Sequence, residues 1–176
     1  MKALIISADD FEDLELLYPY YRLKETGWEV DVAGPEDGSI RGKHGYSVRV
    51  DMKFEAANPD AYDLLVVPGG RAPEQVRLNQ DALRIVKSFF DADKFVASIC
   101  HGSQVLISAG VVGGRRATCW KGVKDDLIAA GARYFDTDVV VDGNLISSRQ
   151  PSDLPAFMAE VSKVMSLLEK ESRQAA

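Results

Sequence analysis

The sequence predicts an α/β fold of three layers, in which a mostly parallel sheet carries helices on both faces. Short apolar strand candidates alternate with segments of helical periodicity, and this alternation is typical of parallel sheets. The most apolar run, Leu64 to Val67, stops at Pro68-Gly69-Gly70, as expected for a central strand whose carboxyl end faces a ligand crevice. With 176 residues, 46% of them hydrophobic, the chain is expected to form a single domain over residues 1–176.

The first half of the chain is predicted to contain two strands separated by a helix. Lys2 to Ser7 is a buried first strand. A helix is expected from Glu12 to Glu25, because apolar residues recur at helical spacing before Gly27 ends the pattern. These apolar positions are Leu14, Leu17, Tyr18 and Tyr21. A second strand over 28–33, a turn over 35–38 and a short antiparallel excursion over 47–50 complete this half.

The second half repeats the alternation and ends on a long helix. A buried strand over 95–98 runs directly into Cys100, and Gly110 closes the helix that follows. An Asp142-Gly143 pair between apolar residues is a strong signal for a hairpin turn. The predicted elements are a helix over 79–90, the strand over 95–98, a helix over 102–109, the hairpin over 139–146 and an amphipathic helix over 153–171.

Composition and charge exclude several classes of ligand. The formal net charge is -6, with Lys and Arg scattered along the chain, so nucleic acid and anionic membrane surfaces are not expected partners. No apolar run reaches the roughly 20 residues that span a bilayer, and a cytoplasmic protein is expected. Two cysteines without C-x-x-C spacing and two histidines give no support for a metal site, and no Gly-x-Gly follows the first strand. We therefore predict no metal and no cofactor.

Cys100 is the predicted nucleophile. It lies between a strand and a helix, with the small residues Ser98 and Gly102 two positions to either side, which is the pattern of a nucleophile elbow. The positive end of the helix dipole at this position favours a thiolate at neutral pH. A buried, inert cysteine at a strand end is the alternative.

His101 and Gly69-Gly70 are candidates to assist that sulfur. The backbone N–H of His101 is expected to face an oxyanion formed beside Cys100, and Gly70 could supply a second donor. A direct contact between the side chains of Cys100 and His101 would require the unusual backbone of an elbow, because adjacent side chains in regular elements diverge. His101 could instead be an ordinary residue at a helix start, and Gly69-Gly70 an ordinary turn.

Carboxylates near the predicted crevice have two possible roles each. The loop Asp9-Asp10-Phe11-Glu12-Asp13 opens the first helix, and Asp9 or Asp10 is expected as its N-cap. Glu12 is either a solvated residue of the helix cap, which this segment alone favours, or turns into the crevice and serves as a proton shuttle. Glu74 is a candidate to orient His101 or a simple helix-leading acid. Cys119 lacks the elbow context and is expected to be structural.

Several motifs in order carry a resemblance to a known family along essentially the whole chain. The motifs are Phe11-Glu12-Asp13 with Glu15-Leu16, Gly42-Lys43-His44-Gly45-Tyr46, Val67-Pro68-Gly69-Gly70-Arg71-Ala72-Pro73-Glu74, Ala97-Ser98-Ile99-Cys100-His101-Gly102, and Val141-Asp142-Gly143-Asn144 with Ser147-Ser148-Arg149. With them the sequence resembles the PfpI-type intracellular proteases of the ThiJ/PfpI superfamily, relatives of the class I glutamine amidotransferase domain.

The resemblance implies a flavodoxin-like sandwich and specific roles for the residues that match. It implies Cys100 as nucleophile, Glu12 as the carboxylic acid bonded to its sulfur, and His101 as general base. The amides of Gly70 and His101 would form the oxyanion hole, beside Gly69 in the substrate pocket. Glu74 would complete a Cys-His-Glu arrangement across a subunit interface, so a homodimer or hexamer is expected. Trp120, also in the pocket, stands where relatives often carry tyrosine, which puts any tyrosine role there in doubt.

Three functions remain open at this stage. The preferred one is a cysteine-dependent enzyme acting on reactive aldehydes or glycated adducts, of the glutathione-independent glyoxalase or deglycase type, because a carboxyl group beside the sulfur suits aldehyde chemistry. An intracellular cysteine peptidase acting on small peptides is the first alternative. A noncatalytic redox sensor or holdase chaperone, with an oxidisable thiolate at Cys100, is the second.

Overall fold

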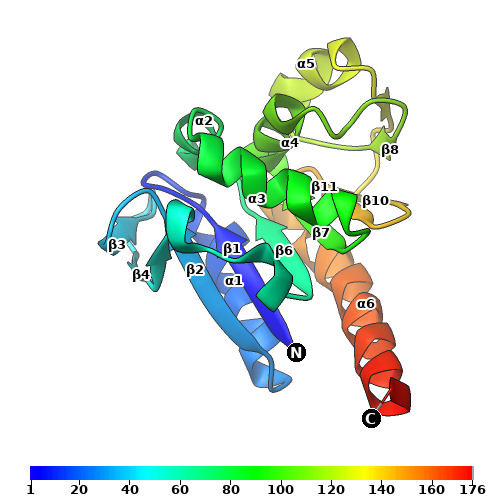
Figure 1. Cartoon of the computed structure of the whole chain (residues 1–176). Coiled ribbons are helices and arrows are strands. Elements are labelled where there is room, and N and C mark those ends of the chain that lie inside the picture. Colours follow the sequence, from blue (N-terminus) through cyan, green and yellow to red (C-terminus); the bar gives the residue numbers. More distant parts are fainter. Residues whose placement is uncertain (176) are drawn as a thin grey trace.

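A seven-stranded sheet forms the centre of the molecule, with helices on both sides (Figure 1). The computed structural model describes residues 1–175, with side chains through residue 174, and Ala176 of the predicted domain lies outside the described residues. The strand order is β10-β11-β7-β6-β1-β2-β5, and every pair is parallel except β10 with β11. The predicted three-layer α/β class, with a mostly parallel flavodoxin-like sheet, is confirmed.

The strands are short, and those predicted over 2–7, 28–33, 64–67 and 95–98 and in the hairpin are present in that order, whereas the two-residue strands over 52–53, 116–117 and 133–134 were not predicted. Those of the central sheet are β1 (Lys2–Ile6), β2 (Glu29–Gly34), β5 (Met52–Lys53), β6 (Leu64–Val67), β7 (Phe95–Ile99), β10 (Val139–Asp142) and β11 (Leu145–Ser148). Two small sheets flank it, formed by β3 (Gly38–Arg41) with β4 (Ser47–Val50) and by β8 (Arg116–Ala117) with β9 (Arg133–Tyr134).

The helices divide into two groups that pack against the sheet. Helix α1 contacts α6, whereas α2 and α3 both contact α4, which in turn contacts α5. In Figure 1, α3 lies in front of the central strands and α1 lies behind them. The helices are α1 (Asp13–Glu25), α2 (Ala72–Val76), α3 (Gln80–Asp91), α4 (Ser103–Ala109), α5 (Lys124–Ala129) and α6 (Leu154–Ala175).

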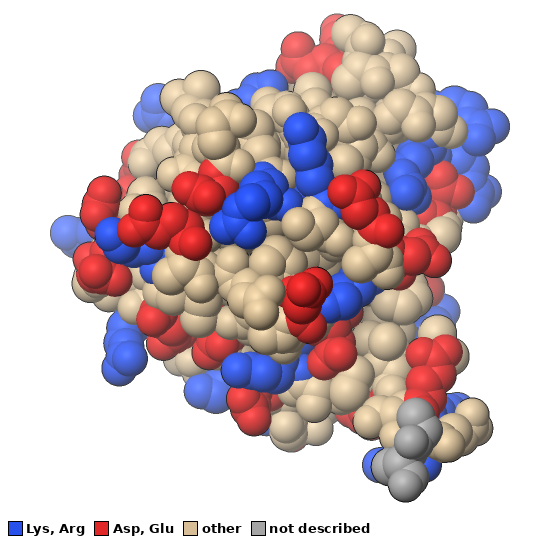
Figure 2. Space-filling model, viewed as in Figure 1, with Lys and Arg blue, Asp and Glu red and all other residues tan. Residues whose placement is uncertain are grey.

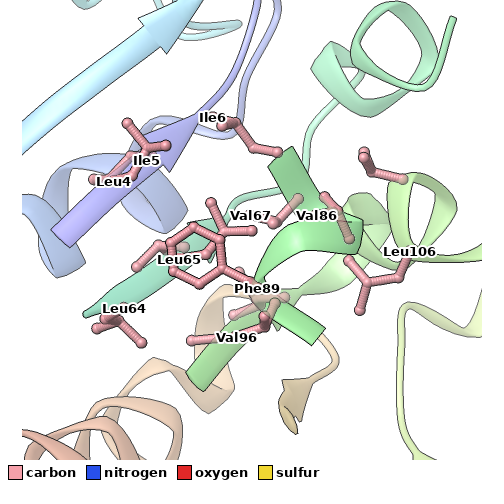
Figure 3. Packing of buried hydrophobic residues seen from close by; sticks show 14 of the residues in the cluster. Leu4, Ile5, Ile6, Leu64, Leu65, Val67, Val86, Phe89, Val96 and Leu106 are labelled. Atoms are coloured by element: carbon pink, nitrogen blue, oxygen red, sulfur yellow. The ribbon is translucent and has the colours of Figure 1, made fainter. Parts of the chain in front are cut away.

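The core fills both faces of the sheet, and the part between the sheet and α3 is seen in Figure 3, where the four-residue strand β6 is buried throughout. Leu65 of β6 lies beside Phe89 of α3, and Val96 of β7 belongs to the same cluster. Burying such side chains contributes roughly 1.5–3 kcal/mol each. Because β1, β6 and β7 are parallel neighbours, the segments that follow them meet at one edge of the sheet.

One prediction about the start of α1 is wrong. Neither Asp9 nor Asp10 caps the helix: Glu12 occupies the N-cap position, and the Asp9 carboxylate accepts a hydrogen bond from the Arg41 backbone N–H at 2.7 Å. The apolar positions that indicated the helix lie mainly on its outer face, since Leu14 and Tyr21 are 56% and 63% exposed. The buried face carries Glu15, Leu16, Pro19 and Leu23.

Charged residues of both signs share the surface. On the face shown in Figure 2, Lys and Arg are interspersed with Asp and Glu and form no continuous basic stripe. None of the helices in residues 1–175 combines the length and the apolar character that a membrane crossing requires.

Candidate active site

Cys100 sits on a strained turn between β7 and α4. Its φ of 61° lies in the left-handed region, which is costly for a residue with a side chain. The turn packs tightly against β6 because residue 102 is glycine: a Cβ there would lie 2.3 Å from the carbonyl oxygen of Val67 and 2.9 Å from the Ser98 Oγ. This is the geometry of a nucleophile elbow.

The elbow brings two consecutive side chains together. The Sγ of Cys100 lies 3.2 Å from the Nδ1 of His101. Side chains of neighbouring residues point apart in a regular strand or helix, so the left-handed backbone of Cys100 is what permits this contact. The imidazole can therefore exchange a proton directly with the thiol.

Glu15 is the carboxylic acid beside the sulfur. It is 0% exposed, and its Oε2 accepts a hydrogen bond from the Gly69 backbone N–H at 2.9 Å. Burial raises the pKa of Glu15 to about 8, although the Gly69 bond opposes this shift. At neutral pH the carboxyl is mostly protonated and faces the thiol, each group shifting the pKa of the other. Its Oε1 has no hydrogen-bond partner within residues 1–175.

Glu12, predicted to bond to the sulfur, is placed differently. It lines the same cavity, but its carboxylate forms an ion pair with Lys43 and lies 3.5 Å from the His44 Nε2. Glu12 is the N-cap residue and has an extended backbone, so the helical geometry that would place positions i and i+3 on one face does not apply to Glu12 and Glu15. The expected contact with Cys100 is therefore corrected from Glu12 to Glu15.

The prediction of a thiol with a lowered pKa is also wrong. Cys100 is only 8% exposed, and burial is the largest effect raising the pKa of its thiol, followed by the charge of the Glu15 carboxylate. The backbone N–H groups of His101 and Gly70 point toward the sulfur and oppose the rise. Forming the thiolate therefore requires a neighbouring group to accept the proton.

Gly70 places its N–H beside the sulfur through a backbone that only glycine tolerates here. Its φ is 81°, and a Cβ would lie 2.3 Å from the Glu12 nitrogen and 2.4 Å from the Asp10 carbonyl oxygen. The amides of Gly70 and His101 thus converge where charge on a substrate oxygen would develop next to Cys100.

The sulfur opens into a cavity of about 350 Å³. Gly69, predicted in the substrate pocket, does not line it: a Cβ at Gly69 would lie 2.6 Å from the Glu15 Oε2 and 2.7 Å from the Cys100 Cβ, so Gly69 lies behind these side chains. Trp120 does line the cavity. The full lining is Glu12, Glu15, Lys43, Gly70, Arg71, Cys100, His101, Trp120 and Pro151.

Sequence reasoning missed Glu15, Lys43, Arg71 and Pro151. For Glu15 a signal was present, because a glutamate lies on the same helical face as Leu16, Pro19 and Leu23, where an apolar residue is expected. Lys43 comes from the segment between β3 and β4, and Pro151 from the turn before α6. Neither position follows from a local pattern.

His101 has two further neighbours. Its ring stacks on that of Trp120, with centroids 6.2 Å apart and planes inclined by 29°. Burial lowers the pKa of His101, the charge of Glu74 raises it and that of Lys43 lowers it. Glu74, in α2 of the same chain, therefore influences the imidazole by its charge. No hydrogen bond joins Glu74 to His101 within the described part of the chain.

Cys119 lies outside the cavity. It is fully buried, and burial raises the pKa of its thiol to about 11. No group of three or more His, Cys, Asp or Glu side chains in residues 1–175 is arranged to hold a metal ion.

Comparison with known proteins identifies similar chains. The model of the DJ-1/PfpI family matches residues 1–164. A protein named a deglycase in Pyrococcus abyssi is 60% identical over 165 residues, covering 94% of this chain and 99% of its own. YraA of Bacillus subtilis, named as a candidate cysteine protease, is 37% identical over 160 residues, covering 90% of this chain and 95% of its own.

A solved structure shows the same fold. A two-domain protein from Anabaena variabilis, with a DJ-1/ThiJ/PfpI-like and a ferritin-like domain, is 37% identical with a TM-score of 0.93. The match covers 94% of this chain and 50% of that protein, so this chain spans half of the two-domain protein's length.

Proposed function

This chain belongs to the DJ-1/PfpI family, and on that premise we propose that it is a cysteine-dependent enzyme of the glutathione-independent glyoxalase or deglycase type, acting on reactive aldehydes such as methylglyoxal or on their glycated adducts. The observation that carries the proposal is the placement of a largely protonated carboxyl, Glu15, against the Cys100 thiol inside a small cavity. The deglycase name of a relative that is 60% identical over nearly its whole length supports the same activity.

In the first step Cys100 adds to the aldehyde carbon. The thiol proton passes to the Nδ1 of His101 as the carbon–sulfur bond forms, which relieves the cost of ionising a buried thiol. Negative charge develops on the aldehyde oxygen, and the amides of Gly70 and His101 face it. Glu15 then gives its proton to this oxygen and completes a hemithioacetal.

Glu15, now a carboxylate, moves a proton between two carbons. It takes the proton of the carbon bonded to sulfur, His101 protonates the neighbouring oxygen, and an enediol results. Glu15 returns its proton to the second carbon while His101 removes the proton of the first oxygen, which leaves a lactate thioester. In the last step Glu15 takes one proton of a water molecule, whose hydroxyl adds to the thioester carbon, and His101 returns its proton to the departing Cys100 sulfur. Lactic acid leaves and loses its proton to the solvent, so methylglyoxal and one water are consumed for each lactate and all three residues regain their starting states.

Peptide hydrolysis is a second candidate, favoured by the 3.2 Å contact between Cys100 and His101. An imidazole, a thiol and two amide donors suffice for an acyl-enzyme. That chemistry gives no role to a buried carboxylic acid facing the sulfur, and desolvation of Glu15 would then be a cost without benefit. We therefore rank aldehyde processing first.

The proposal is tested by following methylglyoxal loss and lactate formation with freshly reduced protein and no glutathione. Cys100→Ala should abolish both, whereas Cys119→Ala, a buried cysteine outside the cavity, should retain them. Absence of lactate with the wild-type protein, or turnover that survives Cys100→Ala, would overturn the proposal. Cleavage of small peptide amides by the wild type, lost in Cys100→Ala, would favour the peptidase.

A further inference from the structure

Trp120 contacts both consecutive residues of the strained elbow. Its backbone N–H donates a hydrogen bond to the carbonyl oxygen of Cys100 at 3.3 Å, and its ring stacks on the imidazole of His101 at a centroid distance of 6.2 Å. The residue comes from the segment between β8 and α5, far from the elbow in sequence. The two contacts together attach this segment to the peptide unit that carries the nucleophile.

The backbone contact fixes the carbonyl group of Cys100, the residue with the strained backbone. The Cys100 carbonyl also accepts a hydrogen bond from the Ser103 Oγ at 3.2 Å, so two donors from different elements fix its direction. A left-handed residue that is not glycine persists only where its surroundings determine its conformation. The Trp120 N–H supplies part of that constraint from outside the elbow.

The ring contact restricts the imidazole. The inclination of 29° and the 6.2 Å separation fall in the range of offset aromatic stacking. Apart from the Cys100 sulfur, the His101 ring makes no hydrogen bond within residues 1–175. Stacking is therefore the contact in the described chain that resists rotation of the ring away from the sulfur.

We propose that Trp120 is a positioning residue, whose indole holds the His101 imidazole in the orientation that directs Nδ1 at the Cys100 sulfur. The indole exchanges no proton and forms no bond with a substrate in this role. Its effect is to keep a proton acceptor within reach of a thiol that does not ionise readily by itself. The proposal deepens the proposed function, on which its kinetic consequence rests.

Charged groups around His101 are distinct from this stacking contact. Glu74 and Lys43 act on the imidazole through their charge. Lys121 instead contacts the indole, with its Nζ 5.6 Å from the centroid of the Trp120 ring. Lys121 does not line the cavity. Lys121→Met therefore changes the charge near Trp120 while keeping the indole on His101, and it serves as the matched control.

The direct test is the NMR spectrum of the imidazoles. The chain has two histidines, so His101 is identified by elimination once His44→Gln removes the other signal. Stacking on an indole should shift the ring protons of His101 upfield. Trp120→Leu should remove this shift and alter the pH titration of His101, Trp120→Phe should keep much of it, and Lys121→Met should leave it in place.

The kinetic test compares the wild type with Trp120→Leu, Trp120→Phe and Lys121→Met. Trp120→Leu should lower kcat/KM for methylglyoxal by about ten- to a hundredfold, as expected for a misplaced proton acceptor, with most of the loss in kcat. Trp120→Phe should recover most of the activity, and Lys121→Met should stay close to wild type. The rate of Cys100 alkylation by iodoacetamide should fall in parallel, in a measurement that needs no turnover.

The outcomes separate the two proposals. An unchanged His101 resonance and a kcat/KM within twofold of wild type in Trp120→Leu would overturn the positioning role. If the wild type does not process the aldehyde, the proposed function fails, but the NMR shift and the alkylation rate still decide the role of Trp120. Should Trp120→Leu fail to fold, Trp120→Met supplies a second unstacked side chain for the same comparison.

Discussion

The Glu15 carboxylate accepts a hydrogen bond from the backbone N–H of Gly69 at 2.9 Å, although 54 positions separate the two residues in the sequence. The contact joins the first turn of α1 to the segment that follows β6. It places a carboxyl group of raised pKa against the Cys100 thiol and leaves its second oxygen without a partner in the described residues. Four predictions concern this arrangement and the residues around it.

Glu15→Gln should lower kcat/KM for methylglyoxal by at least about a hundredfold, the range of a lost general acid or base. Glu12→Gln should have a smaller effect, because Glu12 pairs with Lys43 and not with the sulfur. In the wild type, activity should decline as pH rises through about 8, where Glu15 loses the proton that it must donate. Steady-state kinetics of the two variants across pH provide the measurement, and a larger loss in Glu12→Gln would contradict this assignment.

Stability should depend on pH through the same carboxyl. The pKa of Glu15 rises from 4.5 to about 8 on folding, so the folded state keeps a proton that the unfolded chain has lost between these values. The contribution of the Glu15 proton to the free energy of unfolding is at its full value below pH 4.5 and falls to zero as the pH rises to about 8. The change amounts to roughly 3–5 kcal/mol. Urea unfolding should show that the free energy of unfolding of the wild type falls between pH 5 and pH 8, and that the fall is much smaller in Glu15→Gln. An equal fall in the two proteins would refute this role of Glu15.

Gly70→Ala should destabilise the protein more than Gly110→Ala. Both glycines have positive φ, 81° and 72°, but a Cβ at Gly70 meets backbone atoms at 2.3 Å whereas nothing lies within 4 Å at Gly110. Gly110→Ala should therefore cost only the conformational strain of roughly 1–2 kcal/mol. Gly70→Ala should cost more and also lose activity, because the Gly70 N–H would move. Equal unfolding free energies would contradict the clash.

Glu74→Gln should lower the pKa of His101. The Glu74 carboxylate favours the protonated imidazole, so its removal leaves burial and the charge of Lys43, which both lower the pKa. An NMR titration of the two histidines measures the change, with His44 as internal reference. A His101 pKa that stays the same or rises would show that the charge of Glu74 does not reach the imidazole in solution.

Local signals were sufficient for the fold and for the elbow. Strand β6 ends at Pro68-Gly69-Gly70 and β7 runs into Cys100, as an apolar run followed by turn residues predicts. Small residues around Cys100 indicated the sharp turn, since packing of Gly102 against β6 leaves no space for a side chain. These features depend on residues that are neighbours in the sequence, so they can be recognised from one sequence alone.

Helix α1 shows where local patterns fail. It carries apolar residues on both faces, and of the positions that predicted the helix, Leu14, Tyr18 and Tyr21 are exposed while Leu17 is partly buried. Which face turns inward is decided by the entry of the chain into the helix. Phe11, just before the helix, is held between Gly42 and Gly70 by backbone bridges. These bridges set the rotation of α1 about its own axis, which directs Glu15 to the sulfur and Glu12 to Lys43.

The sequence by itself determined the α/β class, the order of the elements and the position of the nucleophile, because periodicity and turn chemistry are properties of contiguous residues. Tertiary structure alone decided which carboxyl faces Cys100 and whether its thiol ionises easily. Both depend on burial and on charges from distant segments, such as Glu15 from α1 and Gly70 after β6. Desolvation is a property of the assembled core, and no pattern within a single segment encodes it.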